Sequence, residues 1–194
     1  KYNGQMSGTS GLAKRLEGIN IKLTNQTYSG SIVYTTHVQS YGWQGNENDP
    51  NTWKRNGVMS GTSGEAKRLE AIRIALTGEM AEHYDVYYRV HAQSFGWLGW
   101  AKNGETAGTS GFAKRLEAIQ IYVVPKGMTP SSGTSAVSYV QYGKAASKSD
   151  QPGLINYATH VQTYGNQQFV SDGSFSGTYG EAKRLEAIRI QVNN

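Results

Sequence analysis

The sequence predicts an all-β protein in which repeated units assemble with pseudo-threefold symmetry, as in a β-prism. Three observations lead to this prediction. A long string of residues recurs along the chain, and an Asn-Gly or Asp-Gly dipeptide stands shortly before each copy of the string. Segments rich in β-branched and aromatic residues precede the dipeptide in the full units. Units of this kind bury their apolar faces against one another. A β-trefoil and a linear array of small β-units are the alternatives.

The recurring string reads Gly-Thr-Ser-Gly-x-Ala-Lys-Arg-Leu-Glu-x-Ile-x-Ile and opens at Gly8, Gly61 and Gly108, with a fourth copy at Gly177 that has Tyr179 for the serine. A second string, of the form Thr-His-Val-Gln-Ser-Tyr-Gly-Trp, precedes three of the copies. We therefore divide one domain, 1–194, into a leading half-unit (1–23), a first full unit (24–77), a second full unit (78–124), an insertion or linker (125–152) and a last unit (153–194). The chain opens in the middle of a repeat, so we expect it to be part of a longer protein.

The first strand of each full unit is predicted from residue type. Segments 33–39 and 86–91 are rich in β-branched and aromatic residues, which favour strands. Further along each copy, the dipeptide predicts a two-residue hairpin turn, because it accepts positive φ at both central positions. These dipeptides are Asn3-Gly4, Asn56-Gly57, Asn103-Gly104 and Asp172-Gly173.

The second strand of each unit is predicted from its alternation. Residues 72–76 alternate with period two, as a half-buried strand does. On such a strand, Arg68, Glu70 and Ile72 share one face. A one-turn helix at the start of this segment is the alternative, since Ala, Lys, Leu and Glu favour helix.

Composition excludes several classes of protein. The chain has no cysteine, which excludes disulfides, Cys-type zinc sites and thiol catalysis. No apolar run approaches the roughly 20 residues that span a bilayer, so we expect no membrane insertion. The net charge of +5 comes from Lys and Arg interspersed with Glu, which favours a mixed-charge surface over a nucleic-acid site. We expect no cofactor and no metal.

The repeat resembles the clostridial hydrophobic repeat with a characteristic Trp, the ChW repeat. The signature of that family is matched in order by Gly96-Trp97, Asn103-Gly104, Gly108-Thr109 and residues 115–121. The resemblance covers nearly all of the chain except 125–152, and Asn166 stands where the last unit should have its Trp. It implies an extracellular module of Gram-positive bacteria, often attached to wall-active enzymes and adhesins, with a proposed role in cell-wall or polysaccharide binding.

The recurrent carboxylate is interpreted as structural. A neighbouring Arg favours its ionised form and makes it a poor proton donor, and it recurs in every copy, whereas an enzyme needs one site. We therefore expect no catalytic residues and no enzyme activity. The expected ion pairs are Arg15 with Glu17, Arg68 with Glu70, Arg115 with Glu117, and Arg184 with Glu186.

Candidate ligand-binding residues are aromatic or carry hydrogen-bonding groups. Aromatic rings can lie against the apolar faces of sugars while polar neighbours bind the hydroxyls. The candidates are Trp43, Trp97, Trp53, Trp100, His37, Gln39, His91, Gln93, His160, Gln162, Thr62 and Thr109. The alternatives are that each His and Gln holds its strand to a neighbour and that one Trp per unit is core. Asn166 favours an exposed position, because an unfilled Trp cavity would cost about 3–5 kcal/mol.

These observations predict a non-catalytic, lectin-like module at the bacterial cell surface. Several weak sites in one chain would gain affinity for peptidoglycan or another polysaccharide through effective concentration. The alternative function is a protein–protein interaction or adhesion module, since aromatic residues also dominate protein interfaces.

Overall fold

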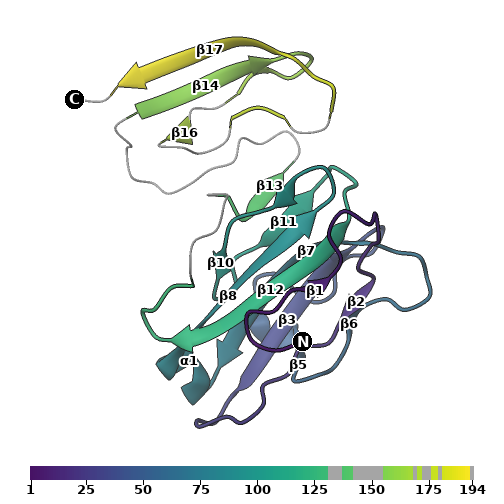
Figure 1. Ribbon diagram of the computed structural model, residues 1–194, viewed down its shortest axis with the longest axis vertical. Helices are drawn as coiled ribbons and strands as arrows, with labels where there is room; N and C mark the ends of the chain where they lie inside the picture. The colour runs from purple at the N-terminus through teal and green to yellow at the C-terminus, as the bar shows by residue number, and fades with distance from the viewer. Residues whose placement is uncertain (131–136, 142–154, 168–169, 172–175, 179–180, 193–194) are drawn as a thin grey trace.

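The computed structural model describes residues 1–130, 137–141, 155–167, 170–171, 176–178 and 181–192 (Figure 1). Most of the expected insertion and the predicted turn at Asp172-Gly173 lie outside these residues. Within them the chain is an all-β repeat assembly, as the sequence predicts. No helix in the described residues is both long and apolar enough to cross a membrane.

The two full units have the same order of strands, and each adds one short helix at a different place. The first contains β3 (Ser31–Val38), β4 (Gly42–Trp43), η1 (Pro50–Thr52), β5 (Lys54–Arg55), β6 (Ser60–Gly61) and β7 (Leu69–Thr77). The second contains α1 (Glu79–His83), β8 (Tyr84–Ala92), β9 (Gly96–Trp97), β10 (Ala101–Lys102), β11 (Ala107–Ser110) and β12 (Leu116–Pro125). In each, a long antiparallel pair, β3 with β7 or β8 with β12, forms the body of a sheet.

The remaining elements belong to incomplete or separate units. The leading half-unit holds β1 (Ser7–Gly8) and β2 (Gly18–Ile19), and β13 (Tyr139–Gln141) follows the second full unit. The last unit holds β14 (Ile155–Val161), β15 (Gly165–Asn166), β16 (Val170–Ser171) and β17 (Leu185–Val192). Its strands pair with one another and form a sheet of their own.

The leading half-unit and the two full units close a ring by exchanging short strands. The half-unit's β1 pairs with β12, the first full unit's β6 pairs with β2, and the second full unit's β11 pairs with β7. Each unit therefore donates a strand to one neighbour and accepts a strand from the other. The pseudo-threefold prediction holds, but the half-unit closes the ring with residues 78–124 and the last unit lies outside it.

Equivalent leucines join the ring at its centre. The N–H of Leu16 donates to the carbonyl of Leu116 (2.8 Å), and the N–H of Leu69 donates to the carbonyl of Leu16 (2.8 Å). Leu69 and Leu116 are each 1% exposed and belong to one apolar core with Ile72, Ile74 and Tyr88, against which Leu16 packs. The core is thus shared by the three units.

Glycine is required where the exchanged strands meet. Gly61 has φ +113°, and a Cβ there would lie 2.3 Å from the carbonyl oxygen of Glu17. Gly8 and Gly108 are equally close to Glu117 and Glu70. Only a residue without a side chain lets the two backbones approach this closely.

One prediction of local structure is confirmed and another needs correction. The predicted second strands are present and begin at Leu69 and Leu116, and the one-turn helix considered as the alternative is absent because Ala66 and Ala113 adopt φ of +56° and +55°. The Asn-Gly turns have positive φ at both positions at Asn56-Gly57 and Asn103-Gly104, as predicted. Asn3-Gly4 differs, with positive φ only at the glycine.

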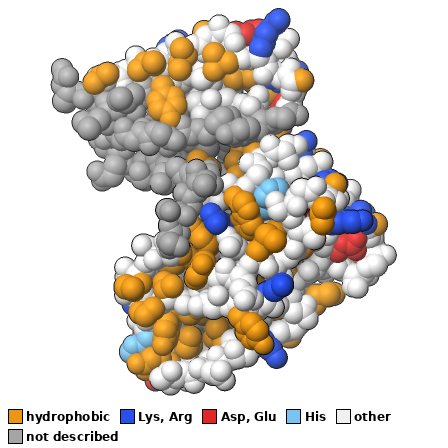
Figure 2. All heavy atoms as spheres, viewed as in Figure 1, with side chains coloured by type: hydrophobic (Ala, Val, Ile, Leu, Met, Phe, Trp, Pro, Cys, Tyr) orange, Lys and Arg blue, Asp and Glu red, His pale blue; other side chains and the backbone are white. Residues whose placement is uncertain are grey.

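The last unit leaves apolar side chains uncovered. Leu185, Ile188, Ile190 and Val192 of β17 are 55–67% exposed, whereas their equivalents Leu69, Ile72, Ile74 and Leu76 are at most 8% exposed. Figure 2 shows hydrophobic side chains along this part of the molecule, above the ring. The apolar face of the second strand is therefore buried in the first full unit of the ring and exposed to solvent in the last unit.

Candidate functional site

A β-bulge brings a histidine and a glutamate together in each unit that has two long strands. Val38 pairs with Leu69 and His37 pairs with Ala71, so Glu70 is the extra residue of the bulge. The same shift occurs at Glu117 and Glu186. A bulge re-aims side chains, which corrects the expected alternation: Ile72 enters the core with Leu69, and Glu70 turns toward His37.

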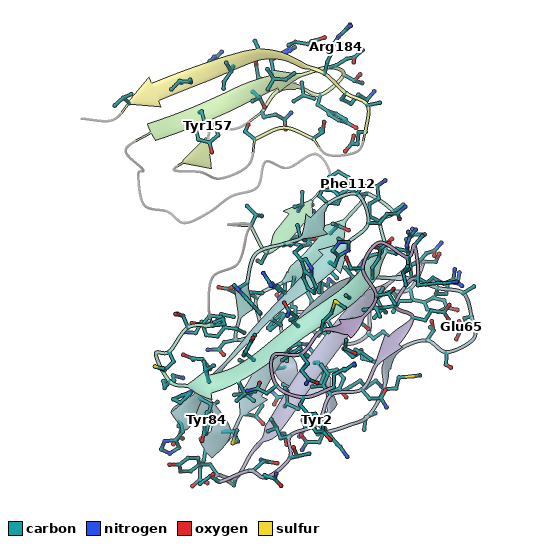
Figure 3. All side chains as sticks on the ribbon, viewed as in Figure 1. Tyr2, Glu65, Tyr84, Phe112, Tyr157 and Arg184 are labelled. Atoms are coloured by element: carbon teal, nitrogen blue, oxygen red, sulfur yellow. The ribbon has the colours of Figure 1, made fainter. Side chains whose placement is uncertain are left out.

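The glutamate carboxylate binds a histidine through one oxygen and an arginine through the other. Nδ1 of His37 lies 3.2 Å from Glu70 Oε2, and Nε of Arg68 donates to Glu70 Oε1 (2.9 Å). The second full unit repeats this with His91 3.0 Å from Glu117, which Arg115 also binds. The last unit repeats it with His160, Glu186 and Arg184, and Figure 3 labels Arg184 on its separate sheet. The half-unit has only Arg15 and Glu17.

This arrangement keeps the carboxylate charged. Burial alone raises the pKa of Glu70, but the bonds from His37 and Arg68 outweigh it and hold that pKa below its ordinary value. The predicted pairs of Arg and Glu are present in all four copies, and their histidine partners were not foreseen. The charged carboxylate fixes the position of the imidazole ring.

A tryptophan stands against the histidine in two units. Trp43 pairs with His37 across the tight turn from β3 to β4, and Trp97 pairs with His91 in the same way. The rings meet edge to face at 5.6 Å and 5.7 Å between centroids. Both indoles are half-buried, and in the last unit the exposed Asn166 takes this position opposite His160.

An arginine lies over each of these tryptophans. The guanidinium of Arg73 on β7 is 5.4 Å from the Trp43 ring, and that of Arg89 on β8 is 5.0 Å from Trp97 and 4.7 Å from Trp100. Cations at this distance are attracted by the ring's π-electrons. Because the two arginines come from different strands of their units, no shared sequence position identified them.

Three predicted ligand-binding residues are buried and serve packing. Trp53 is 5% exposed, and its indole N–H donates to the carbonyl of Asn46 (2.8 Å). Thr62 and Thr109, at 6% and 1% exposed, lie in the exchanged segments, where Thr62 N–H donates to the carbonyl of Glu17. Their burial between backbones corrects the expectation that they face a ligand.

The other candidates remain near the surface. Trp100 is half-buried beneath Arg89 and meets Tyr122 edge to face at 5.5 Å. Gln39, Gln93 and Gln162 are half-buried, and the backbone N–H of each donates to the carbonyl of the unit's Arg68, Arg115 or Arg184. The structure thus brings the His, Trp and Glu of each full unit together, while the Gln is tied through its backbone to the Arg that binds this Glu.

A second repeated contact borders the tryptophan turn. The Tyr41 hydroxyl donates to Glu65 Oε2 (2.7 Å), and Lys67 lies 5.4 Å from the Tyr41 ring. The bond to Glu65 raises the pKa of Tyr41. Tyr164 and Glu181 repeat the pair in the last unit, whereas the second full unit packs Phe95 against Phe112. Figure 3 shows Glu65 and Phe112 at the rim of the ring.

Within the described part of the chain, no group of three or more His, Asp or Glu side chains is placed to hold a metal ion. The arrangement can offer aromatic surface, guanidinium donors and a fixed imidazole. It has no paired carboxylates of the kind that cleave glycosidic bonds, because each full unit supplies one carboxylate to it, already bound by a histidine and an arginine.

Comparison with known proteins gave one family match. The family described as ChW, clostridial hydrophobic W, matches residues 1–25, 37–78, 91–125 and 160–194. Each of the three later matches begins at the histidine of the site and runs to the end of the second strand or just beyond it. No curated protein and no solved structure matched the chain.

Proposed function

The chain belongs to the clostridial hydrophobic W family, and we propose that it is a non-catalytic, extracellular module that binds cell-wall glycan or another polysaccharide. The observation that carries the proposal is the half-buried Trp97 between His91 and Arg89. An indole that stays partly exposed offers an apolar surface to a sugar ring, and the guanidinium beside it offers donors to hydroxyl or anionic groups.

Repetition of the site supports weak, multivalent binding. Trp43 with His37 and Arg73 repeats the arrangement in the first full unit of the same ring. Two weak sites held in one rigid ring bind a polymer more tightly than either site alone, because the second binding event is intramolecular. The last unit has His160 and Glu186 but no indole, so we propose that it does not contribute.

The charge state of Glu70 supports a binding role over catalysis. A carboxylate whose pKa is held below its ordinary value, as at Glu70, is ionised at neutral pH and cannot act as a general acid. His37 and Arg68 also occupy its two oxygens. We therefore propose that the Glu side chains position the site.

The test is sedimentation of the chain with Gram-positive cell walls, with and without their anionic polymers, across a salt series. Binding to stripped walls at high salt that is lost in Trp43→Ala/Trp97→Ala supports aromatic glycan binding. The matched control is Asn166→Ala, which removes the residue at the same position of the last unit and should leave binding unchanged.

Two outcomes would contradict the proposal. Binding that disappears with salt on intact walls would point to an electrostatic contact with anionic polymer. The absence of binding under every condition would exclude a wall ligand.

A second candidate function is protein assembly, favoured by the uncovered side chains of β17. In the ring, sister units cover the equivalent positions, so the partner that fits this face is another unit of the same family. The measurement is the molar mass of the chain by light scattering. Assembly that Ile188→Asp abolishes would support this function, and a monomer at high protein concentration would exclude it.

A further inference from the structure

Among the described residues of the ring, Arg89 is the one half-buried arginine without a carboxylate beside it. Each of the others has a carboxylate oxygen within 4.0 Å, and they are Arg68, Arg73 and Arg115. The guanidinium of Arg89 lies 5.0 Å from the Trp97 ring and 4.7 Å from the Trp100 ring. A half-buried charge without a counter-ion is unfavourable, so this side chain favours an anionic ligand.

The two terminal nitrogens of Arg89 are available to such a ligand. Nε donates to Oε1 of Gln120 (2.7 Å), which fixes one edge of the guanidinium. In the part of the chain that the structure describes, no acceptor binds Nη1 or Nη2. Two parallel N–H donors of this kind match the two oxygens of a carboxylate.

The first full unit supplies an anion to its own arginine. Nε of Arg73 donates to Oγ1 of Thr106 (2.8 Å), and Nη1 donates to the carbonyl of Glu47 (2.9 Å). The Glu47 carboxylate lies 4.0 Å from Nη2. Glu47 belongs to the insertion at 45–51, so this insertion provides the oxygens that Arg89 lacks.

The second full unit has no such insertion. Residues 45–51 have no counterpart between Trp97 and Trp100. Trp53, which follows the insertion, is 5% exposed, and its indole N–H donates to the carbonyl of Asn46 (2.8 Å). The equivalent Trp100 is half-buried, and its Nε1 has no hydrogen-bond partner among the described residues. The insertion therefore covers in one unit a surface that the other unit leaves open.

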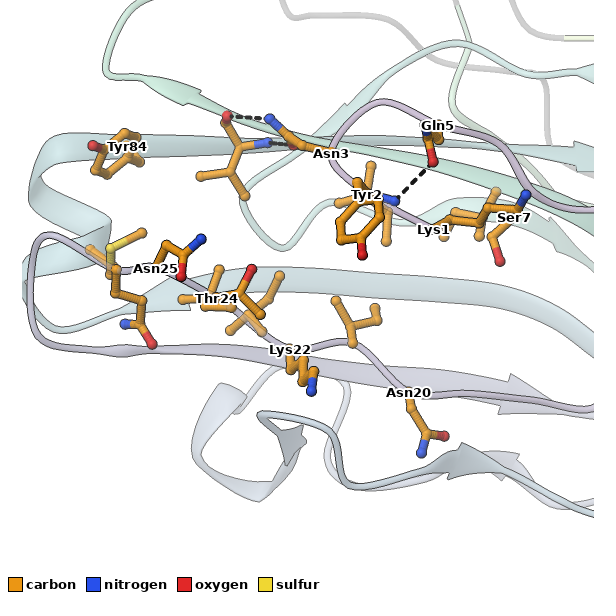
Figure 4. Close-up of a pocket in the computed structure, with 18 of the residues that line it drawn as sticks. Lys1, Tyr2, Asn3, Gln5, Ser7, Asn20, Lys22, Thr24, Asn25 and Tyr84 are labelled. Atoms are coloured by element: carbon orange, nitrogen blue, oxygen red, sulfur yellow. Dashed lines mark hydrogen bonds between the residues drawn. The ribbon is translucent and has the colours of Figure 1, made fainter.

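The leading half-unit helps to hold Arg89 in place. Gln120, which binds Nε of Arg89, donates through Nε2 to the carbonyl of Gly4 (3.3 Å). Figure 4 shows Asn3, from the same segment, bound to the backbone of Val123 by two hydrogen bonds. The guanidinium is thus fixed before a ligand arrives, which reduces the entropy lost on binding.

We propose that the open surface around Arg89 binds the carboxylate of an acidic sugar. This inference rests on the proposed glycan-binding function and narrows its ligand to a carboxylate-bearing glycan. The terminal nitrogens of Arg89 bind the carboxylate, and the half-buried Trp97 contacts the apolar face of the sugar ring. In the first full unit, Glu47 takes the place of the ligand's carboxylate.

The two sites of the ring therefore differ in what they select. Trp43 is half-buried and keeps an aromatic surface, but the guanidinium beside it is already bound. The first full unit should bind sugars without a preference for charge. The second should prefer the acid, because only Arg89 has terminal nitrogens to offer.

The test compares digalacturonate with its dimethyl ester, which has the same sugar rings but no carboxylate. Each is titrated into the full chain in about 0.15 M salt, and the indole N–H signals are followed by NMR. We expect the acid to bind about tenfold more tightly than the ester, since an ion-paired hydrogen bond is lost in the ester. The signals of Trp97 and Trp100 should shift with the acid, and that of the buried Trp53 should not.

Two arginine variants with equal net charge separate a fitted site from general attraction. Arg89→Gln should remove the advantage of the acid, so that the acid and the ester bind alike. Arg189→Gln is the matched control, because it removes the same charge from an exposed side chain of β17 and should leave the advantage intact. An equal loss in both variants would overturn the proposal. The Tm of each variant shows that the ring remains folded.

A third variant tests the role given to the insertion. Glu47→Ala removes a carboxylate that is 42% exposed, so the fold should be retained. We expect a new, acid-dependent shift of the Trp43 signal, because Nη2 of Arg73 is then free. A Trp43 signal that stays unchanged would overturn the assignment of Glu47 as a substitute for the ligand.

Failure of this inference can be told from failure of the proposed function. Equal affinity of the wild-type chain for the acid and the ester would overturn the preference for a carboxylate and leave glycan binding in place. If neither compound bound, the inference would also be wrong. Retention on stripped cell walls, measured separately, would then decide whether the chain binds glycan through Trp43 and Trp97.

Discussion

Nδ1 of His91 lies 3.0 Å from Oε2 of Glu117. Glu117 is the extra residue of a β-bulge, so it has no pairing partner on β8. The same relationship joins His37 to Glu70, where the pKa of the carboxyl is held low by His37 and Arg68. The bulge in the sheet therefore places a charged carboxylate next to the histidine of the site.

Replacing Glu70 with Gln should destabilise the fold. The side chain is nearly buried and its carboxylate is bound by His37 and Arg68, and hydrogen bonds to charged groups contribute about 1.5–3 kcal/mol each. We expect a loss of about 2–3 kcal/mol in the free energy of unfolding, measured by urea denaturation. Glu17→Gln is the matched control: its pair is exposed and has no histidine, so the loss should be under about 1 kcal/mol. Equal losses in the two variants would contradict the role given to the histidine.

Asp85 should make stability depend on pH in acid. The side chain is 1% exposed; burial raises its pKa, but bonds from the Gly127 N–H, Asn103 and Lys102 lower it further, so the net pKa lies well below 3.8. A depressed folded-state pKa stabilises the fold above the unfolded pKa, and this contribution is lost as the pH falls below it. Asp85→Asn should therefore cost about 2–3 kcal/mol at pH 7.

The difference between wild type and Asp85→Asn should shrink as the pH falls from about 4 to 2, since wild type then gains a proton on unfolding. Denaturant titrations of both proteins at several pH values measure this. A difference that stays constant over that range would show that Asp85 is not charged in the folded protein.

Gly61→Ala should open the ring. A Cβ there would lie 2.3 Å from the Glu17 carbonyl oxygen and 2.5 Å from Gly18 Cα, and neither backbone atom can move aside alone. We expect a loss of about 3–4 kcal/mol, from overpacking together with the left-handed backbone. Gly64→Ala has a φ of +75° with nothing within 4 Å, so it should cost only about 1–2 kcal/mol by thermal unfolding.

Asn166→Trp should add a binding site to the last unit. Asn166 is exposed opposite His160, and His160 already lies 3.2 Å from Glu186, as in the units that carry tryptophan. We expect tighter binding to stripped cell walls, several-fold by avidity, without a change in Tm. Asn166→Leu, apolar but not aromatic, is the control. Equal gains from both variants would show that the indole has no specific role.

The two tryptophans of the first full unit should behave differently. Trp53 is 5% exposed, so Trp53→Ala should cost about 3–5 kcal/mol of stability. Trp43 is half-buried, and Trp43→Ala should lower stability less while weakening wall binding. Paired measurements of Tm and wall retention distinguish them. If the Trp53→Ala protein folded but no longer bound cell walls, Trp53 would be part of the binding site.

Local features were predictable from sequence, and features made by distant contacts were not. The strands β3 and β8 and the turn at Asn56-Gly57 follow from residue type alone. The bulge at Glu70 does not, because it forms where Gly108 of the next unit approaches the Glu70 carbonyl. Period-two reasoning therefore assigned Glu70 and Ile72 to one face.

The repeat pattern also could not predict which three units form the ring. Four similar copies do not reveal which three associate, and the contact that decides it joins Gly8 to Ala118 across most of the ring's sequence. The arginines over the tryptophans were missed for another reason. Arg73 lies on a second strand and Arg89 on a first strand, so the same contact has no common position in the repeat.

Strand exchange around the ring also determines how these units must fold. In an open solenoid, each repeat can form next to its neighbour, and stability grows by addition along the chain. Here β1 pairs with β12, which lies at the other end of the ring's sequence, and β2 pairs with β6 of the following unit. The three units should therefore melt in a single cooperative transition, and folding should be slow, because the closing contact joins the most distant segments and its loop entropy is lost before the core forms.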